Sequence, residues 1–206
     1  MLAPERVVAT HVTGPGPFPF GPALELDGLS DDDRDRGERF NQFQADGLGY
    51  LQMQSTRPQT LAYSLNDSPV GQLAWIVEKF KEWTDPAAAL PEDAVDLDQL
   101  LTNVSIYWFT GSGASSAHFT YEGMQAFREF VAQSGGESAA PVPPGPPMGV
   151  AVFAADHSIR HLVDPAGEIE HWSEFDDGGH FPAMESPDLL VGDLRSFFGG
   201  VGSRRP

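Results

Sequence analysis

The feature that most constrains the fold of this chain is its C-terminal segment, residues 169–198. It begins with the stretch Ile169–Phe175, passes through the turn Asp176-Asp-Gly-Gly-His180, and ends in an amphipathic stretch over residues 186–198. This order predicts a β-strand, a tight diglycine turn and a closing helix. A histidine on such a turn is typical of a general base at the carboxyl edge of a parallel sheet.

Two apolar runs predict two more strands. Residues 6–13 (RVVATHVT) form a β-branched run that ends at a cluster of Gly and Pro, and residues 148–153 (MGVAVF) are continuously apolar. The first run is expected to be a buried strand. The predicted order is therefore strand, long helical insertion, strand, strand, helix. Continuous apolar strands separated by helices predict a parallel sheet in the α/β class.

The residues between the first two strands predict mainly helices. Ser30 followed by three aspartates is typical of an N-cap with first-turn acids, and we favour this interpretation over a metal site. Pro58 lies near the start of a further helix, Gly49–Gln54 is expected to be a short connector, and Leu2–Glu5 the tail of a helix. The predicted helices cover residues 30–46, 57–63, 70–83, 96–109, 124–132 and 186–198.

Composition excludes several classes of function. The chain holds 12 Lys and Arg against 30 Asp and Glu, and such an acidic surface disfavours nucleic-acid binding. It holds no cysteine, which removes disulfides, thiolate nucleophiles and thiolate metal sites. The sequence shows neither a signal-peptide pattern nor a run of ~20 apolar residues that could cross a membrane. We therefore expect a cytoplasmic protein without membrane contact.

Asp156 and His180 are the candidate catalytic pair. They follow the second and third predicted strands, so both are expected at the same edge of the sheet. The chain order, acid before histidine, is that of the α/β-hydrolases. The carboxylate would hold the imidazole in one tautomer and stabilise the imidazolium while His180 takes a proton from water.

Two plainer interpretations stand beside this one. A histidine after a strand is often only a polar loop residue, although the Gly-Gly-His-Phe context and the upstream acid favour a functional role. His157 and His161, beside Asp156 and not far from His171, could in principle bind a metal. Their sequence is His-Ser-Ile-Arg-His rather than His-Glu-x-x-His, and no third ligand has a diagnostic spacing. We therefore expect no metal and no cofactor.

Longer strings give a specific resemblance. The chain is similar to the C-terminal half of an epoxide hydrolase of the microsomal-like family within the α/β-hydrolases, and the similarity covers nearly the whole chain. The strings that carry it are GYLQMQ at 49–54, PQTLAY at 58–63, NDSPVG at 66–71, VEKFKEW at 77–83, LTNVSIYW at 101–108, Ser115-Ser116, VAVFAAD at 150–156 and DGGHFPAME at 177–185.

The resemblance implies a two-step hydrolysis of an epoxide to a vicinal diol. A carboxylate opens the epoxide to a hydroxyalkyl ester, and a histidine-activated water then hydrolyses the ester. His180 would be that base and Asp156 its orienting acid. Tyrosines of the lid donate hydrogen bonds to the epoxide oxygen, and Tyr50 matches the first of them. At the second position the alignment places Thr120, with Tyr121 one residue further along, so Tyr121 is the alternative donor. Both tyrosines could instead simply pack with neighbouring tryptophans.

The resemblance also implies a domain organisation. The fold expected is a truncated α/β-hydrolase fold, with the last three core parallel strands, flanking helices and a helical cap insertion. Residues 1–22 would hold a core strand, residues 23–136 the helical cap, or lid, and residues 137–206 the C-terminal core with the acid and the histidine.

The nucleophile of the family has no counterpart in these 206 residues. The sequence holds neither Gly-x-Asp-x-Gly nor Gly-x-Ser-x-Gly, and no other aspartate has the context of an elbow: Asp67 lies in a turn, and Asp31–Asp33 start a helix. The isolated chain is therefore expected to be inactive on epoxides. A fragment or mis-called start, a decayed gene product and one half of a split protein all remain open. In the last case, the exposed strand at residues 6–13 would pair with a complementing N-terminal half or with another copy.

Two other functions stay open at this point. An esterase or dehalogenase would share the acid and the histidine, although the lid strings match epoxide hydrolases specifically. A non-catalytic binding or interaction protein would use the aromatic lid as an apolar pocket, and the missing nucleophile favours this reading.

Overall fold

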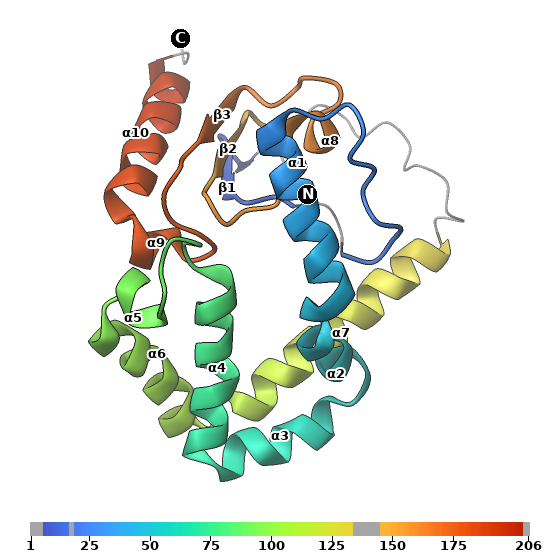
Figure 1. The fold of residues 1–206 in the computed structure, drawn as a ribbon, viewed down its shortest axis with the longest axis vertical. Helices are drawn as coiled ribbons and strands as arrows, with labels where there is room; N and C mark the ends of the chain where they lie inside the picture. Colours follow the sequence, from blue (N-terminus) through green and yellow to red (C-terminus); the bar gives the residue numbers. More distant parts are fainter. Residues whose placement is uncertain (1–5, 17–18, 134–144, 204–206) are drawn as a thin grey trace. The chain divides into compact units, whose positions relative to one another are not determined.

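The computed structural model describes residues 6–16, 19–133 and 145–203, which pack into two compact units (Figure 1). The sheet unit comprises residues 1–45, 83–94 and 143–206, and the helical unit comprises residues 46–82 and 95–142. The predicted helix tail at residues 2–5 lies outside the described residues. The predicted functional division at residues 22 and 136 stays a prediction.

The sheet unit is built on three parallel strands, as the sequence predicts. They are β1 (Thr10–Thr13), β2 (Met148–Val152) and β3 (His171–Glu174), in the spatial order β1-β2-β3. β1 is shorter than predicted, and it is half-buried rather than buried. The reason is its position at the edge of this sheet, where it pairs only with β2 and presents threonines at both ends.

Helices cover both faces of the sheet (Figure 1). On one face Val12, Val150 and Trp172 lie in register and pack with Ile169 and with Val163 of α8 (Arg160–Val163). Helix α1 (Asp31–Gln42) lies on this face as well, and the side chain of Ser30 caps it as predicted by accepting a hydrogen bond from the Asp33 amide. A π-helical turn, η2 (Phe43–Gly47), continues α1.

The opposite face is covered by the long C-terminal helix α10 (Pro187–Ser203). On this face His11, Gly149 and His171 occupy one row across the three strands. Phe197 of α10 packs against that row, since a Cβ atom at position 149 would lie 3.0 Å from its ring. Two single-turn helices complete the unit, α5 (Pro91–Ala94) and α9 (Pro182–Glu185).

The helical unit contains five helices over the residues that the structure describes. They are α2 (Gly49–Thr56), α3 (Pro58–Asp67), α4 (Pro69–Trp83), α6 (Leu97–Thr110) and α7 (Gly113–Gln133), with Trp83, the last residue of α4, already in the sheet unit. Helix α7 packs against α2 and α3, and Leu61, Leu65 and Ala117 form a buried cluster with Trp75 beside it. None of the described helices combines the length and the apolar character that a membrane crossing needs.

Two predictions about this unit are wrong. The expected connector at residues 49–54 is helical, because α2 packs on α7 although its own residues show almost no amphipathic pattern. The short helix expected at residues 124–132 is only the last part of α7, which begins at Gly113. The Ser- and Gly-containing first half of α7 is held by packing on α2 and α3 rather than by its intrinsic helix propensity.

Candidate active site at the carboxyl edge of the sheet

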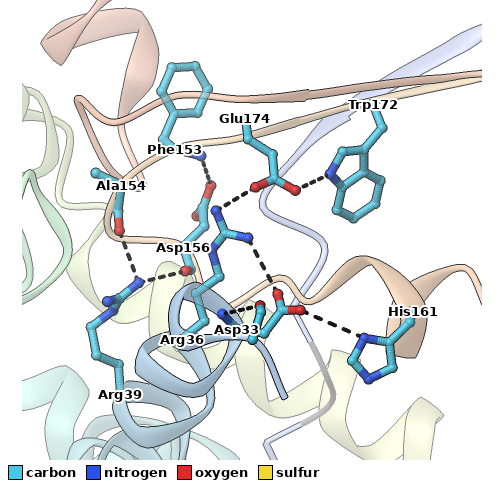
Figure 2. Close-up of polar contacts among 10 residues, drawn as sticks. Asp33, Arg36, Arg39, Phe153, Ala154, Asp156, His161, Trp172 and Glu174 are labelled. Carbon is cyan, nitrogen blue, oxygen red and sulfur yellow. Dashed lines mark hydrogen bonds and ion pairs between the residues drawn. The ribbon is translucent and has the colours of Figure 1, made fainter. Parts of the chain in front are cut away.

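Asp156 lies just after β2, in a tight turn that its own side chain closes. The Phe153 amide donates a 2.7 Å hydrogen bond to Oδ2 of Asp156, while the Asp156 amide donates to the Phe153 carbonyl oxygen (Figure 2). The side chain is buried, and burial raises the pKa of Asp156 to about 6. The acid predicted from sequence therefore lies at the expected edge and ionises only near neutral pH.

Helix α1 reaches the same turn from the side. Nη2 of Arg39 donates hydrogen bonds to the carbonyl oxygens of Ala154 and Asp156, at 3.1 and 3.3 Å (Figure 2). Arg36, one turn earlier, pairs with Glu174 at the end of β3 at 2.8 Å. Two arginines of one helix thus tie down the carboxyl ends of β2 and β3. Neither arginine is predicted as a site residue from the sequence, because their partners are more than 100 residues away.

His180 lies on a loop whose backbone is held at several points. Gly178 has a φ of +77°, a conformation that favours glycine, and a Cβ atom on Gly179 would overlap the carbonyl oxygen of Trp83. The amide of His180 donates to that same carbonyl oxygen at 2.8 Å. The diglycine predicted to permit a tight turn therefore also permits close approach to the Trp83 backbone.

The His180 ring packs edge-to-face against Trp83 and Phe181, with ring centroids 5.2 and 5.1 Å away. The residue nevertheless remains open to solvent. Partial desolvation by the surrounding protein lowers the pKa of His180, so the ring stays neutral to lower pH than a free imidazole. A neutral, accessible imidazole is the form that a general base needs.

The loops of Asp156 and His180 lie side by side. Amide groups of Ala154 and Ala155 donate hydrogen bonds to the carbonyl oxygens of Asp177 and Gly178, at 3.5 and 3.1 Å. Over the residues that the structure describes, no hydrogen bond joins the imidazole of His180 to the carboxylate of Asp156. The structure therefore brings together the two loops predicted to form the site and leaves the two side chains without a direct bond.

Glu185 and Asp85, which were not predicted as site residues, support the His180 loop. Oε1 of Glu185 accepts from the Phe181 amide at 2.9 Å, and Oε2 accepts from the Asp85 amide at 2.7 Å. Asp85 in turn accepts from the Gly178 amide at 2.7 Å. The pattern Phe-Pro-x-x-Glu, in which a proline begins a helical turn and an acid ends it, could have predicted the role of Glu185 from the sequence. No local sequence pattern predicts the role of Asp85.

The three histidines weighed as a metal site lie in different surroundings. His157 packs against Phe40 and Phe43, and burial, followed by the charge of Arg39, lowers its pKa to about 4. His161 is exposed and faces Asp33 at 3.9 Å. His171 contacts Asp193 of α10. The structure does not bring these three rings together with Asp156.

The predicted lid tyrosines both belong to the helical unit. Tyr50 opens α2, and the ammonium of Lys79 lies 4.9 Å from the centre of its ring. Burial raises the pKa of Tyr50, so its hydroxyl remains a proton donor at any pH near neutral. Tyr121 lies half-buried on α7, next to Thr120, whose hydroxyl donates to the Ser116 carbonyl oxygen. The two tyrosines thus stand on helices that pack against each other.

The chain is similar in sequence to proteins that are named as epoxide hydrolases. It is 38% identical over 200 residues, 96% of its length, to a homologue from Stigmatella aurantiaca whose name assigns it to the epoxide hydrolases. It is 36% identical over 159 residues to epoxide hydrolase 1 of Sus scrofa. The chain belongs to the microsomal-type epoxide hydrolase family. It spans about two fifths of the length of the first of these relatives (42%) and 34% of the second.

Solved structures of family members agree with this assignment. The epoxide hydrolase of Aspergillus niger superposes with a TM-score of 0.73 at 27% identity, over 97% of this chain and 49% of its own. The juvenile hormone epoxide hydrolase of Bombyx mori superposes with a TM-score of 0.61 at 29% identity. No family model matches the sequence. The fold is thus part of the α/β-hydrolase fold of these enzymes, as predicted.

Proposed function

We propose that this chain supplies the water-activating base, its orienting acid and the lid donors of an epoxide hydrolase. His180 would be the base, Asp156 the acid, and Tyr50 and Tyr121 the lid donors. The observation that carries the proposal is the pair of adjoining loops at the carboxyl edge of β2 and β3, where His180 is presented on a backbone held by Trp83. Family membership supports the reaction class.

The reaction proposed for the assembled site has two steps, formation of an ester and hydrolysis of that ester. A carboxylate attacks one epoxide carbon, the carbon–oxygen bond breaks, and the alkoxide takes a proton from a lid tyrosine. Neutral His180 then removes a proton from water, and the resulting hydroxide adds to the ester carbonyl. Collapse of the adduct releases the diol and regenerates the carboxylate, while the protons return from imidazolium to solvent and from solvent to the tyrosine.

The pKa directions suit this sequence of events. The lowered pKa of His180 keeps it neutral, and Asp156 becomes a carboxylate only above its pKa of about 6. The raised pKa of Tyr50 keeps its hydroxyl protonated and able to donate. Ester hydrolysis by an assembled site is therefore expected to rise as the pH increases through about 6.

The nucleophilic carboxylate is the part that residues 1–206 do not supply in a recognisable elbow. We propose that it comes from sequence outside these residues, either upstream in a longer chain or from a complementing N-terminal half that pairs along the edge strand β1. The 206-residue chain alone is then inactive. The substrate class proposed is a small apolar epoxide, and a cytoplasmic location remains part of the proposal.

The test is to assay the purified 206-residue chain with styrene oxide, alone and mixed with the N-terminal half of the Stigmatella aurantiaca relative. Diol formation is expected only in the mixture, and it should disappear with His180→Ala. Turnover by the chain alone that is lost with His180→Ala would refute the inactivity. Turnover in the mixture that survives this substitution would refute the role of His180.

A binding function is the second candidate, since the sequence lacks the nucleophile. Calorimetry of the 206-residue chain with a non-hydrolysable urea or amide analogue of the diol ester separates the two. Micromolar binding by a chain that gains no activity in the mixture would favour binding alone.

A further inference from the structure

The face of the sheet under α10 holds a compact group of side chains that the proposed function does not use. Nε2 of His11 lies 2.6 Å from one carboxylate oxygen of Asp193, and Nε2 of His171 lies 2.7 Å from the other. The hydroxyl of Ser173 donates to Asp193 at 2.5 Å and lies 3.2 Å from Nε2 of His171. One ligand atom from each of the two histidines and the aspartate falls within 4.8 Å of the others.

Sheet register explains why these groups converge. His11 on β1 pairs with Gly149 on β2, which pairs with His171 on β3, so both histidines leave the sheet on the same side. The glycine between them leaves the space that they need, because a Cβ atom there would lie 2.9 Å from Cδ2 of His11. Asp193 then enters from α10 above the row. The arrangement requires three strands and one helix in a fixed relation.

The surroundings are those of an enclosed site with one accessible side. The side chains of His11 and Asp193 are only 2% and 4% exposed, whereas that of His171 is 24% exposed. The ring of Phe197 packs against both histidines, at 5.8 and 5.5 Å between centroids. All the polar contacts of Asp193 in the described chain are with imidazole or hydroxyl groups, so no ammonium or guanidinium there balances its carboxylate.

We propose that His11, His171 and Asp193 form a binding site for a divalent first-row metal ion, with zinc as the natural occupant and Ser173 or a water as fourth ligand. Two imidazole nitrogens and a carboxylate oxygen suit zinc, cobalt or nickel rather than magnesium or calcium, which prefer oxygen ligands throughout. The site would join β1, β3 and α10, and it lies apart from the loops of Asp156 and His180, so it stands or falls independently of the proposed function.

Metal entry requires a defined rearrangement. In the metal-free arrangement the nitrogen–oxygen separations of 2.6 and 2.7 Å are hydrogen-bond lengths. Metal–ligand bonds of ~2.1 Å in tetrahedral geometry place neighbouring ligand atoms roughly 3.4 Å apart. The ion would therefore replace the protons shared between the imidazoles and the carboxylate, and the ligand atoms would separate by about 0.7 Å. The exposed side of His171 is the route of entry.

The test uses the untagged 206-residue chain, stripped with a chelator and dialysed against Zn²⁺ or Co²⁺. One metal ion per chain is expected after removal of excess, with the visible absorption of four-coordinate Co²⁺. His11→Asn and His171→Asn should each weaken the association at least ~100-fold, since loss of supporting contacts alone costs 10–100-fold in known sites. Added Zn²⁺ should raise the melting temperature of the wild type but not of these variants.

Two further variants separate loss of metal binding from loss of folding. His161→Asn removes an exposed histidine that faces only Asp33, and it should bind as the wild type does. Asp193→Asn keeps the shape of the side chain and one acceptor, so it should lose metal while staying folded by circular dichroism. A wild type that retains no metal, or affinity unchanged in His11→Asn, would overturn the proposal and leave the cluster as a hydrogen-bonded clamp.

Discussion

The Asp193 group, with His11 and His171, and the Asp156 and His180 loops both belong to the sheet unit, but they differ in hydrogen bonding, in burial and in the direction of the aspartate pKa. Asp193 accepts hydrogen bonds from two histidines and a serine, and although burial alone would raise its pKa, these bonds lower it. Asp156 accepts one backbone bond, and burial raises its pKa to about 6. The hydrogen bonds of the Asp193 group are made within the group, whereas His180 is exposed and its ring contacts Trp83 and Phe181.

The difference shows how to separate structural from catalytic uses of the same residues. In the metal-free arrangement, a cluster whose hydrogen bonds are all made stabilises the fold and leaves no donor or acceptor for a substrate. His180, held by its backbone amide and by ring packing on Trp83 and Phe181, keeps both ring nitrogens available for chemistry. Under the proposed function, direct hydrogen bonding between histidine and aspartate does not mark the catalytic pair in this molecule, whereas loop position and desolvation do.

The largest effect is expected for Asp193→Ala, which disrupts the Asp193 group. Two histidines and Ser173 lose their acceptor at buried or half-buried positions, so the free energy of unfolding should fall by about 3 kcal/mol at pH 7. Urea unfolding in the presence of a chelator measures it without any contribution from metal. Because the pKa of Asp193 is lowered, the advantage of the wild type is complete above pH ~4 and should shrink as the pH falls toward that lowered pKa. A loss below about 1 kcal/mol would show that the group is not a stabilising one.

An opposite sign is expected for Asp156→Asn. The raised pKa means that the folded state binds a proton more tightly than the unfolded state, so wild-type stability is complete below pH ~3.8 and declines as the pH rises to about 6. Two pKa units at about 1.4 kcal/mol each set an upper limit of roughly 3 kcal/mol. The asparagine variant keeps an acceptor for the Phe153 amide and should be more stable than the wild type at pH 7. Unfolding curves at pH 4 and pH 7 check this, and a destabilised variant at pH 7 would contradict the assignment.

A smaller effect is expected for Glu185→Gln. The amide side chain keeps one acceptor oxygen, so either the Phe181 or the Asp85 amide loses its partner, at a cost of about 1 kcal/mol. Amide hydrogen exchange should quicken over residues 178–181 in particular. His161→Asn serves as the control, since replacing an exposed side chain outside this loop should change the free energy of unfolding by less than about 0.5 kcal/mol. Equal exchange rates in wild type and Glu185→Gln would remove Glu185 from the support of the loop.

Local sequence signals predicted much of this structure correctly. Ser30 caps α1 as predicted, α6 begins one residue after the predicted start at Asp96, and β2 and β3 lie within the stretches predicted as strands. These features depend on residues close together in the sequence, so sequence patterns can predict them. The position of Asp156 and His180 at one edge follows from the parallel order of the strands.

What the sequence did not reveal depends on distant partners. The amphipathic signal of α2 is nearly absent, because packing on α7 rather than periodicity makes it a helix. His11 and Asp193 are 182 residues apart, and only the strand register and the position of α10 bring them together. The contact between Glu185 and the Asp85 amide spans 100 residues in the same way. Residue spacing along the sequence cannot predict such long-range contacts.

The hydrogen bonds from the Gly178 and His180 amides to residues 83–85 have a consequence for the modularity of this chain. That short segment, which carries Asp85, lies in sequence between the two stretches of the helical unit. An engineer who excised the helical unit by joining residue 45 to residue 95 would also remove the anchor of the His180 loop. Joining residue 45 to residue 83, and residue 94 to the strand β2, would keep it. The helical unit can therefore be exchanged as a module only if residues 83–94 stay with the sheet unit.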